Sequence, residues 1–155
     1  MALYRTRTYI AADFDDDLDA VNQLHKWNDG KKWSLSFSDA HDLQNSRDKS
    51  KPCSIKASLK MRMDGSKRFV LIVGDHTKDL TKGSCAWCDS YNHNTDKCAN
   101  QKTVDYRSFI KYECDKAVEA IDDGMTIVVI YKSTKIDKSK CPVAVNGPLS
   151  RFSAK

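Results

Sequence analysis

Two short apolar runs constrain the fold of this chain more than any other feature. Residues 69–74 contain no polar side chain, and residues 125–131 are interrupted only by Thr126. A strand that is apolar throughout is expected inside a parallel sheet, where helices cover both faces. Parallel strands also need a crossover of a dozen or more residues between them. The sequence therefore predicts an α/β fold built around these two buried strands.

Shorter patterns before and between these runs complete an alternation of strands and helices. Residues 9–12 and 33–37 have the character of strands, and residues 38–51 that of a polar loop. Apolar side chains recurring every three or four positions predict helices over 15–27, 52–64 and 109–121. Ser50 and Ser108 are the expected caps of the last two helices. The tail after Tyr131 is expected to add at most one short edge strand.

This alternation predicts a doubly wound, three-layer sandwich whose central, mostly parallel sheet has four to five strands. A length of 155 residues suits one domain, which we expect to span residues 1–155. Residues 75–107 are an anomaly, because structureless loops longer than about 12–15 residues are uncommon in compact domains. We interpret this cysteine-rich segment (residues 75–107) as an insertion that requires stabilisation of its own.

Composition and charge limit the cellular compartment and the classes of partner that we expect for this chain. A formal net charge of +5 permits contact with nucleic acid without requiring it. No apolar run approaches the ~20 residues that span a bilayer, and the first residues lack the apolar stretch of a signal peptide. We therefore expect a cytoplasmic protein with no membrane partner, whose six cysteines stay reduced or bind metal.

Half of the cysteines lie within fourteen residues and predict a structural zinc site. Cys85, Cys88, His93 and Cys98 form a Cys-x2-Cys-x4-His-x4-Cys array, which is the spacing of a zinc knuckle. Zinc prefers four tetrahedral nitrogen or sulfur ligands, and a close cysteine pair supplies two thiolates from one turn. The alternatives are reduced cysteines packed in the loop, or a disulfide formed after purification.

Two features of the cysteine-rich segment argue against nucleic-acid binding. No glycine lies between residues 89 and 97, and four lysines balance four aspartates over residues 77–105. A segment that binds nucleic acid should be basic. Trp87 and Tyr91 could stack on bases, but they could equally cover a metal or pack on the domain. If the loop folds back, Cys114 or His76 could replace His93 as a ligand.

Glu113 is the candidate catalytic residue, one position before Cys114 in the apolar stripe of the last helix. A glutamate at the edge of an apolar helical face can have a raised pKa and a fixed rotamer, which suit acid–base or electrostatic catalysis. The alternative is a solvent-facing glutamate paired with Lys111 or Lys116.

The order and spacing of these segments resemble the TIR-like proteins of bacterial Thoeris antiphage systems. The resemblance covers roughly residues 5–135 and rests on Met61–Gly74, Ser108–Cys114 and Ile127–Tyr131. Ser38–Leu43 is similar to the Asp-x-x-Asp loop of TIR domains, without the proline and glycine that follow it there. The resemblance implies a flavodoxin-like fold. It also implies that Glu113, in its Tyr-Glu context, is needed to cleave the nicotinamide–ribose bond of NAD.

The same resemblance implies the product and the partners. The substrate would be NAD, and a cyclic or amino-acid-conjugated ADP-ribose would act as a second messenger for an effector protein. Cleavage develops oxocarbenium character on the ribose, which a nearby carboxylate stabilises. TIR enzymes often need self-association to complete the site, so the resemblance permits a homo-oligomer and leaves the oligomeric state open. No Gly-x-Gly-x-x-Gly is present, so redox use of NAD is not expected.

The substrate pocket is expected outside the carboxyl ends of the strands. The residues predicted to bind substrate there, beside Glu113, are Asp13, Phe14, Ser38, Asp39, His41 and Tyr112. Phe14 could stack on nicotinamide or pack as a hydrophobic staple at a helix start. His41 could equally be a plain loop histidine.

Three other functions stay open. A non-catalytic TIR-like interaction module would have a structural Glu113, a docking surface on the cysteine-rich segment and no pocket beside Glu113. A response-regulator receiver also has acidic residues after its first strand, but no receiver pattern follows Asp75. A zinc-knuckle nucleic-acid binder would lose affinity steeply with salt.

Overall fold

A computed structural model describes residues 7–29, 37–39, 51–132 and 136–145. Within them, four strands form one parallel sheet in the order β2-β1-β3-β6. The strands are β1 (Arg7–Ala11), β2 (Phe37–Asp39), β3 (Ser66–Val73) and β6 (Thr126–Tyr131). This is the order of the first four strands of the flavodoxin-like doubly wound sheet.

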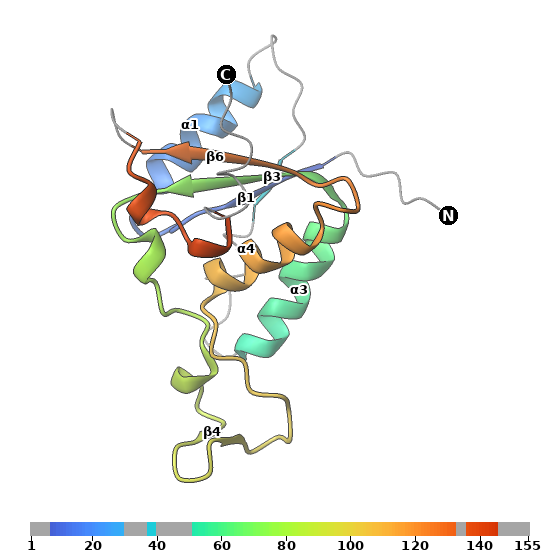
Figure 1. The fold of residues 1–155 in the computed structure, drawn as a ribbon, viewed down its shortest axis with the longest axis vertical. Helices are drawn as coiled ribbons and strands as arrows, with labels where there is room; N and C mark the ends of the chain where they lie inside the picture. Colours follow the sequence, from blue (N-terminus) through green and yellow to red (C-terminus); the bar gives the residue numbers. More distant parts are fainter. Residues whose placement is uncertain (1–6, 30–36, 40–50, 133–135, 146–155) are drawn as a thin grey trace.

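Helices cover both faces of this sheet, which confirms the predicted three-layer sandwich. Figure 1 shows α1 (Leu18–Asp29) on one face, and α3 (Pro52–Asp64) and α4 (Phe109–Glu119) on the other. The chain steps in one direction from β1 to β2 and in the opposite direction from β2 to β3 and on to β6. Right-handed crossovers therefore place the first helix on the face opposite the other two.

The core lies between β3 and the helices on its two faces. Phe69–Val73 of β3 are all buried, as the apolar run predicts. The second run behaves differently, because β6 is only half-buried and Val128 is 40% exposed. Among the described strands β6 pairs with β3 alone, so its outer edge has no described neighbour. The expectation that both runs are fully buried is therefore wrong for β6.

The ends of several elements also differ from those predicted. β2 contains Ser38 and Asp39, which the sequence assigned to a loop, whereas residues 33–36 lie outside the described residues. Lys51 precedes α3 as its N-cap and makes no side-chain capping bond, and the predicted cap Ser50 is outside the described residues. The cap of α4 is confirmed, because Ser108 Oγ accepts a 3.2 Å hydrogen bond from the Lys111 amide.

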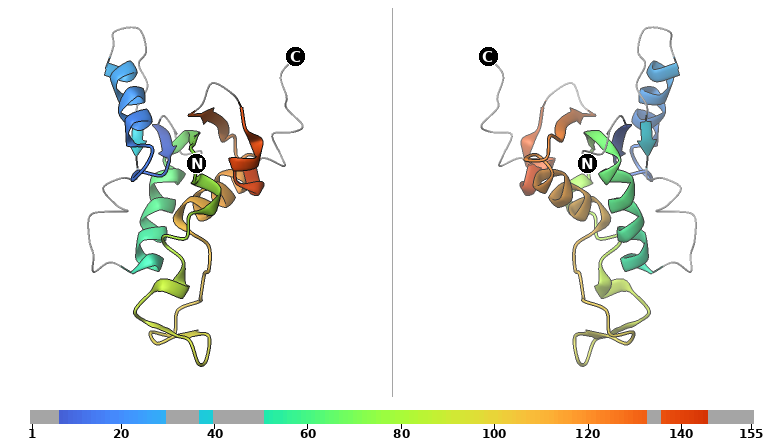
Figure 2. Two further views of the ribbon diagram at one scale, coloured as in Figure 1. Left: turned by 90° about the vertical axis from the view of Figure 1, so that its left-hand side faces the viewer. Right: turned by 90° about the vertical axis from the view of Figure 1, so that its right-hand side faces the viewer.

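The cysteine-rich segment extends away from the sheet, beyond the N-terminal end of α3 (Figures 1 and 2). It contains two short 3₁₀ helices, η1 (Thr77–Asp79) and η2 (Cys85–Trp87), and an antiparallel hairpin of β4 (Tyr91–Asn92) and β5 (Lys97–Cys98). A single buried lysine of α3 ties the returning arm of the segment to the domain. Lys56 Nζ donates to the carbonyl oxygens of Asp105 (3.3 Å) and Arg107 (2.7 Å).

The described part of the tail, residues 136–145, holds the 3₁₀ helix η3 (Lys138–Lys140) and no strand.

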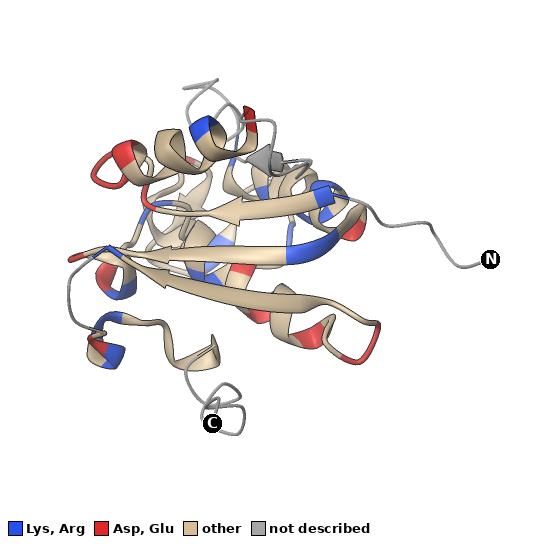
Figure 3. Ribbon diagram, turned by 90° about the horizontal axis from the view of Figure 1, so that it is seen from above, with Lys and Arg blue, Asp and Glu red and all other residues tan. Residues whose placement is uncertain are grey.

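In the described ranges, no helix combines the length and the apolar character that crossing a membrane requires. Seen from above, basic positions lie near the starts of β1 and β3, and both basic and acidic positions lie on the helices and loops (Figure 3).

Candidate functional site

Glu113 occupies the buried face of α4. Its neighbours on that face are Phe109, Ile110 and Ala117, which lie three or four positions away and are all buried. Residues three and four apart share a helical face, so an inward-facing stripe carries Glu113 into the core. The side chain is 0% exposed. The solvent-facing alternative is therefore wrong, and Lys116 instead bridges Glu119 at 2.9 Å.

Tyr9 of β1 is the hydrogen-bond donor that meets this carboxylate. Its phenol donates to Glu113 Oε2 over 2.7 Å, and its ring stacks on Phe69 with centroids 5.7 Å apart. Burial raises the pKa of Tyr9 well above its usual value, and the negative charge of Glu113 raises it further. The phenol therefore stays protonated and remains a donor to the carboxylate. Sequence reasoning missed Tyr9, because nothing in a strand residue indicates which helix lies over it.

Asp13 and Phe14 follow β1 at the carboxyl end of the sheet, as predicted. Both are buried, and with Phe109 and Ile110 of α4 they help to line a small cavity of about 50 Å³. Asp13 Oδ1 accepts a 3.1 Å hydrogen bond from the Asp15 amide, which shapes the turn into α1. The structure therefore brings these two predicted residues next to the first turn of the helix that carries Glu113.

A buried carboxylate ties the same edge of the sheet together. Asp17 is 3% exposed, and its Oδ1 lies 3.4 Å from Nζ of Lys132, the residue that follows β6. Lys132 Nζ also lies 2.7 Å from Asp19 Oδ1. Burial raises the pKa of Asp17, and Lys132 opposes this effect. A Cβ on Gly74 would collide with the Asp17 carboxylate, so the glycine after β3 leaves room for this contact.

The remaining predicted substrate residues are less closely grouped. Ser38 and Asp39 lie in β2, in register with Tyr9 and Ile10 of β1, whereas His41 lies outside the described residues. The Tyr112 ring lies against the cationic groups of three side chains, at 5.0 to 5.8 Å from its centroid: Lys56, Arg107 and Lys116. Neither Glu113 nor Tyr112 lines the small cavity beside Asp13 and Phe14.

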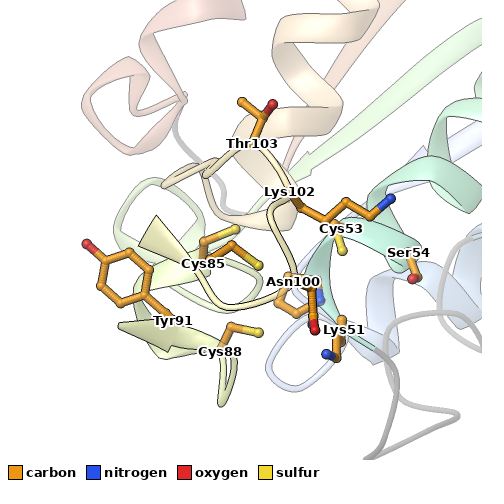
Figure 4. A pocket seen from close by; sticks show the side chains of 11 residues that line it. Lys51, Cys53, Ser54, Cys85, Cys88, Tyr91, Asn100, Lys102 and Thr103 are labelled. Carbon is orange, nitrogen blue, oxygen red and sulfur yellow. The ribbon is translucent and has the colours of Figure 1, made fainter. Parts of the chain in front are cut away.

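A second site lies in the cysteine-rich segment, where Cys85, Cys88 and Cys98 share a pocket of about 260 Å³. Cys53, in the first turn of α3, lines the same pocket (Figure 4). None of these cysteines forms a disulfide. Sequence reasoning missed Cys53, which precedes the predicted array by about thirty residues.

His93, the fourth predicted zinc ligand, does not line this pocket. It is exposed, and its ring packs edge-on against Tyr91 with centroids 4.8 Å apart. Across the described ranges, no three His, Cys, Asp or Glu side chains already stand in an arrangement that would hold a metal ion. The structural support for the predicted zinc site is therefore that three of its four predicted ligands line one pocket.

Backbone amides surround two of the pocket sulfurs. The Asp105 amide donates to Cys85 Sγ over 3.3 Å. The amides of Asn100 and Lys102 donate to Cys98, which lowers the pKa of that thiol, and the nearby lysines lower it further. Hydrogen bonds to the charged form favour a thiolate, which is the form of cysteine that binds metal.

The fold is that of a flavodoxin-like α/β protein. It has a parallel sheet in this strand order, helices on both faces, and polar side chains beyond the carboxyl ends of the strands. Within that class, the family model described as Thoeris protein ThsB, TIR-like domain, matches residues 9–82. The resemblance to Thoeris TIR-like proteins is thereby confirmed over the stretch from β1 to the first part of the cysteine-rich segment. Glu113 and the cysteines at 85–98 lie beyond the matched residues. No curated protein matches the chain at a significant level.

Proposed function

We propose that this chain is a TIR-like enzyme that cleaves the nicotinamide–ribose bond of NAD and makes an ADP-ribose-derived messenger for an effector protein in antiphage defence. The match of residues 9–82 to the family model described as Thoeris protein ThsB, TIR-like domain, supports a part in Thoeris defence. The observation that carries the catalytic part of the proposal is the buried Glu113 on α4, held by Tyr9.

A carboxylate in this position suits the chemistry. Loss of nicotinamide leaves positive charge on the ribose, and a carboxylate in a water-poor site stabilises that charge more strongly than it would in water. The hydrogen bond from Tyr9 fixes the orientation of the Glu113 carboxylate before substrate arrives. Glu113 is therefore assigned the electrostatic role, and Tyr9 acts through it as a positioning residue.

The substrate must approach from the carboxyl end of the sheet. Asp13 and Phe14 line the cavity there, but its volume of about 50 Å³ is far below the roughly 300–1,000 Å³ of typical ligand sites. This cavity is too small to hold NAD as it stands, so we infer that it widens when NAD binds and that Glu113 becomes accessible as it does so. We propose that self-association of two chains causes this opening.

One observation favours a different function, that of a non-catalytic interaction module. Glu113 is 0% exposed, and it does not line the small cavity that Asp13 and Phe14 form with α4. In this alternative Glu113 has a structural role, which includes holding Tyr9, and the domain acts through its surface. The two functions differ in what happens to NAD when Glu113 is neutralised.

The test compares NAD content and product mass in lysates of phage-infected cells that express the wild type, Glu113→Gln or Glu119→Gln. Glu119 lies on the same helix and is exposed, so it controls for the loss of one negative charge. The catalytic proposal predicts NAD loss and a new ADP-ribose species for the wild type and Glu119→Gln, but not for Glu113→Gln. Equal behaviour of all three would support the interaction module.

A further inference from the structure

Four cysteines from three separate segments line one pocket, and we propose that they bind a zinc ion through four thiolates. The ligands are Cys53, Cys85, Cys88 and Cys98. Structural zinc sites are tetrahedral and closed, and a set of four cysteines is among their commonest forms. Thiolate ligands also select zinc over hard cations such as magnesium and calcium.

Cys53 replaces His93 in this ligand set. Cys53 follows Pro52 in the first turn of α3, where the helix dipole favours negative charge. It lines the pocket, whereas His93 is exposed and packs against Tyr91. Figure 4 shows the Cys85 and Cys88 side chains extending toward the helix that carries Cys53. The site therefore joins the cysteine-rich segment to α3 rather than closing within the segment.

Two tight turns present the other three sulfurs. The Cys88 amide donates to the Cys85 carbonyl over 3.0 Å, which closes the turn that carries the first pair. The Gln101 amide donates to the Cys98 carbonyl over 3.0 Å, and Gln101 adopts a left-handed conformation with φ of 57°. Short turns of this kind hold thiols in the close spacing that a metal ion needs.

The surroundings of the pocket supply a hydrogen-bond donor and positive charge that suit bound thiolates. The Asp105 amide donates a 3.3 Å hydrogen bond to Cys85 Sγ. Such bonds orient metal ligands and stabilise their charge. Four thiolates around Zn²⁺ leave two negative charges, and the side chains of Lys51 and Lys102 line the same pocket to offset them.

Binding is accompanied by proton release and closure. Each of the four thiols gives up its proton to solvent as its sulfur bonds to Zn²⁺, and no electron is transferred. The sulfurs do not yet stand in coordinating geometry, so the ion must draw the hairpin and the first turn of α3 together. Zinc would thereby fix a long segment that has little apolar core of its own.

The test is zinc content and cobalt substitution of the full chain purified under reducing conditions. The wild type and His93→Asn are expected to carry one zinc per chain and to give the same thiolate-to-cobalt charge-transfer band. Cys53→Ser should weaken binding by about tenfold or more in competition with a chromogenic chelator, and should weaken that band. Because Cys53→Ser could fold poorly, Cys53→His provides a second variant that keeps a zinc-binding group and exchanges one thiolate for imidazole.

Three results would overturn the proposal. The first is a wild-type chain without zinc, whether its cysteines are reduced or joined in disulfides. The second is loss of zinc in His93→Asn with retention in Cys53→Ser. The third is a cobalt spectrum of Cys53→His that is identical to that of the wild type, because that result would show Cys53 not to be a ligand.

Discussion

The phenol of Tyr9 in β1 donates a 2.7 Å hydrogen bond to Glu113 Oε2 in α4, and both side chains are completely buried. A carboxylate is costly to bury unless hydrogen bonds compensate for the water that it loses. The contact therefore links the centre of the sheet to the helix that carries the candidate catalytic residue. The hydrogen bond between Tyr9 and Glu113 therefore affects both the stability of the domain and the orientation of the Glu113 carboxylate.

Replacing Tyr9 with Phe should destabilise the domain. The substitution keeps the ring that stacks on Phe69 but removes the donor to a buried carboxylate, at a cost of about 1–3 kcal/mol in the free energy of unfolding. Urea unfolding measures this change. The effect should shrink in a Glu113→Gln background, because a neutral amide needs the donor less. An unchanged midpoint for Tyr9→Phe would contradict the contact.

The same pair should make stability fall at alkaline pH. The folded-state pKa of Tyr9 lies well above its unfolded value of about 10, chiefly because of burial and then because of Glu113. Its contribution is therefore fully present below pH 10 and is lost as the pH rises above that value, by at most about 1.4 kcal/mol per pH unit. Unfolding of Tyr9→Phe should depend less on pH in this range, and parallel curves for the two proteins would contradict the assignment.

Lys56 should control the docking of the cysteine-rich segment. It is 4% exposed, donates to two carbonyls of the returning arm and lies 3.5 Å from Asp105. Lys56→Met should cost about 1–3 kcal/mol and raise hydrogen exchange in residues 103–107. The matched control Lys60→Met removes an exposed pair with Asp64 and should cost less than about 0.5 kcal/mol. Equal effects of the two substitutions would contradict the anchoring role.

Two glycines with the same backbone conformation should respond differently to alanine. Gly83 (φ +98°) and Gly124 (φ +93°) both lie in the left-handed region, but a Cβ at Gly83 would lie 2.5 Å from the Phe109 ring, whereas Gly124 faces open space. Gly124→Ala should cost only the backbone strain, about 1 kcal/mol. Gly83→Ala should add about 1–3 kcal/mol for the collision. Similar melting temperatures for the two variants would contradict the packing of Phe109.

Much of the fold could be predicted because its signals are local. The apolar run of β3, the periodicity of α4 and the Ser108 cap each depend on neighbouring residues, and all three are found in the structure. The half-buried state of β6 could not be predicted in this way. Among the described strands β6 pairs with β3 alone, and a strand paired on one side can carry the same apolar side chains as a central strand.

The candidate sites were only partly predictable, because each depends on a contact between distant segments. Glu113 was found from its position beside an apolar stripe, but its burial follows from the packing of α4 against Tyr9. The cysteine spacing located three sulfurs of the second site. Cys53 lies on another element and joins them only after α3 has packed against the sheet, so a search for spacing selects His93 instead.

The most direct test of the central claim is the release of nicotinamide from NAD in triggered lysates, measured for Glu113→Gln and Glu119→Gln variants that unfold at the same temperature as the wild type. The account predicts that Glu119→Gln matches the wild type and that Glu113→Gln releases nicotinamide at least about a hundredfold more slowly, the size of effect expected when one electrostatic stabiliser of the transition state is lost. Equal release by the folded Glu113→Gln variant would contradict the claim that this buried carboxylate cleaves NAD.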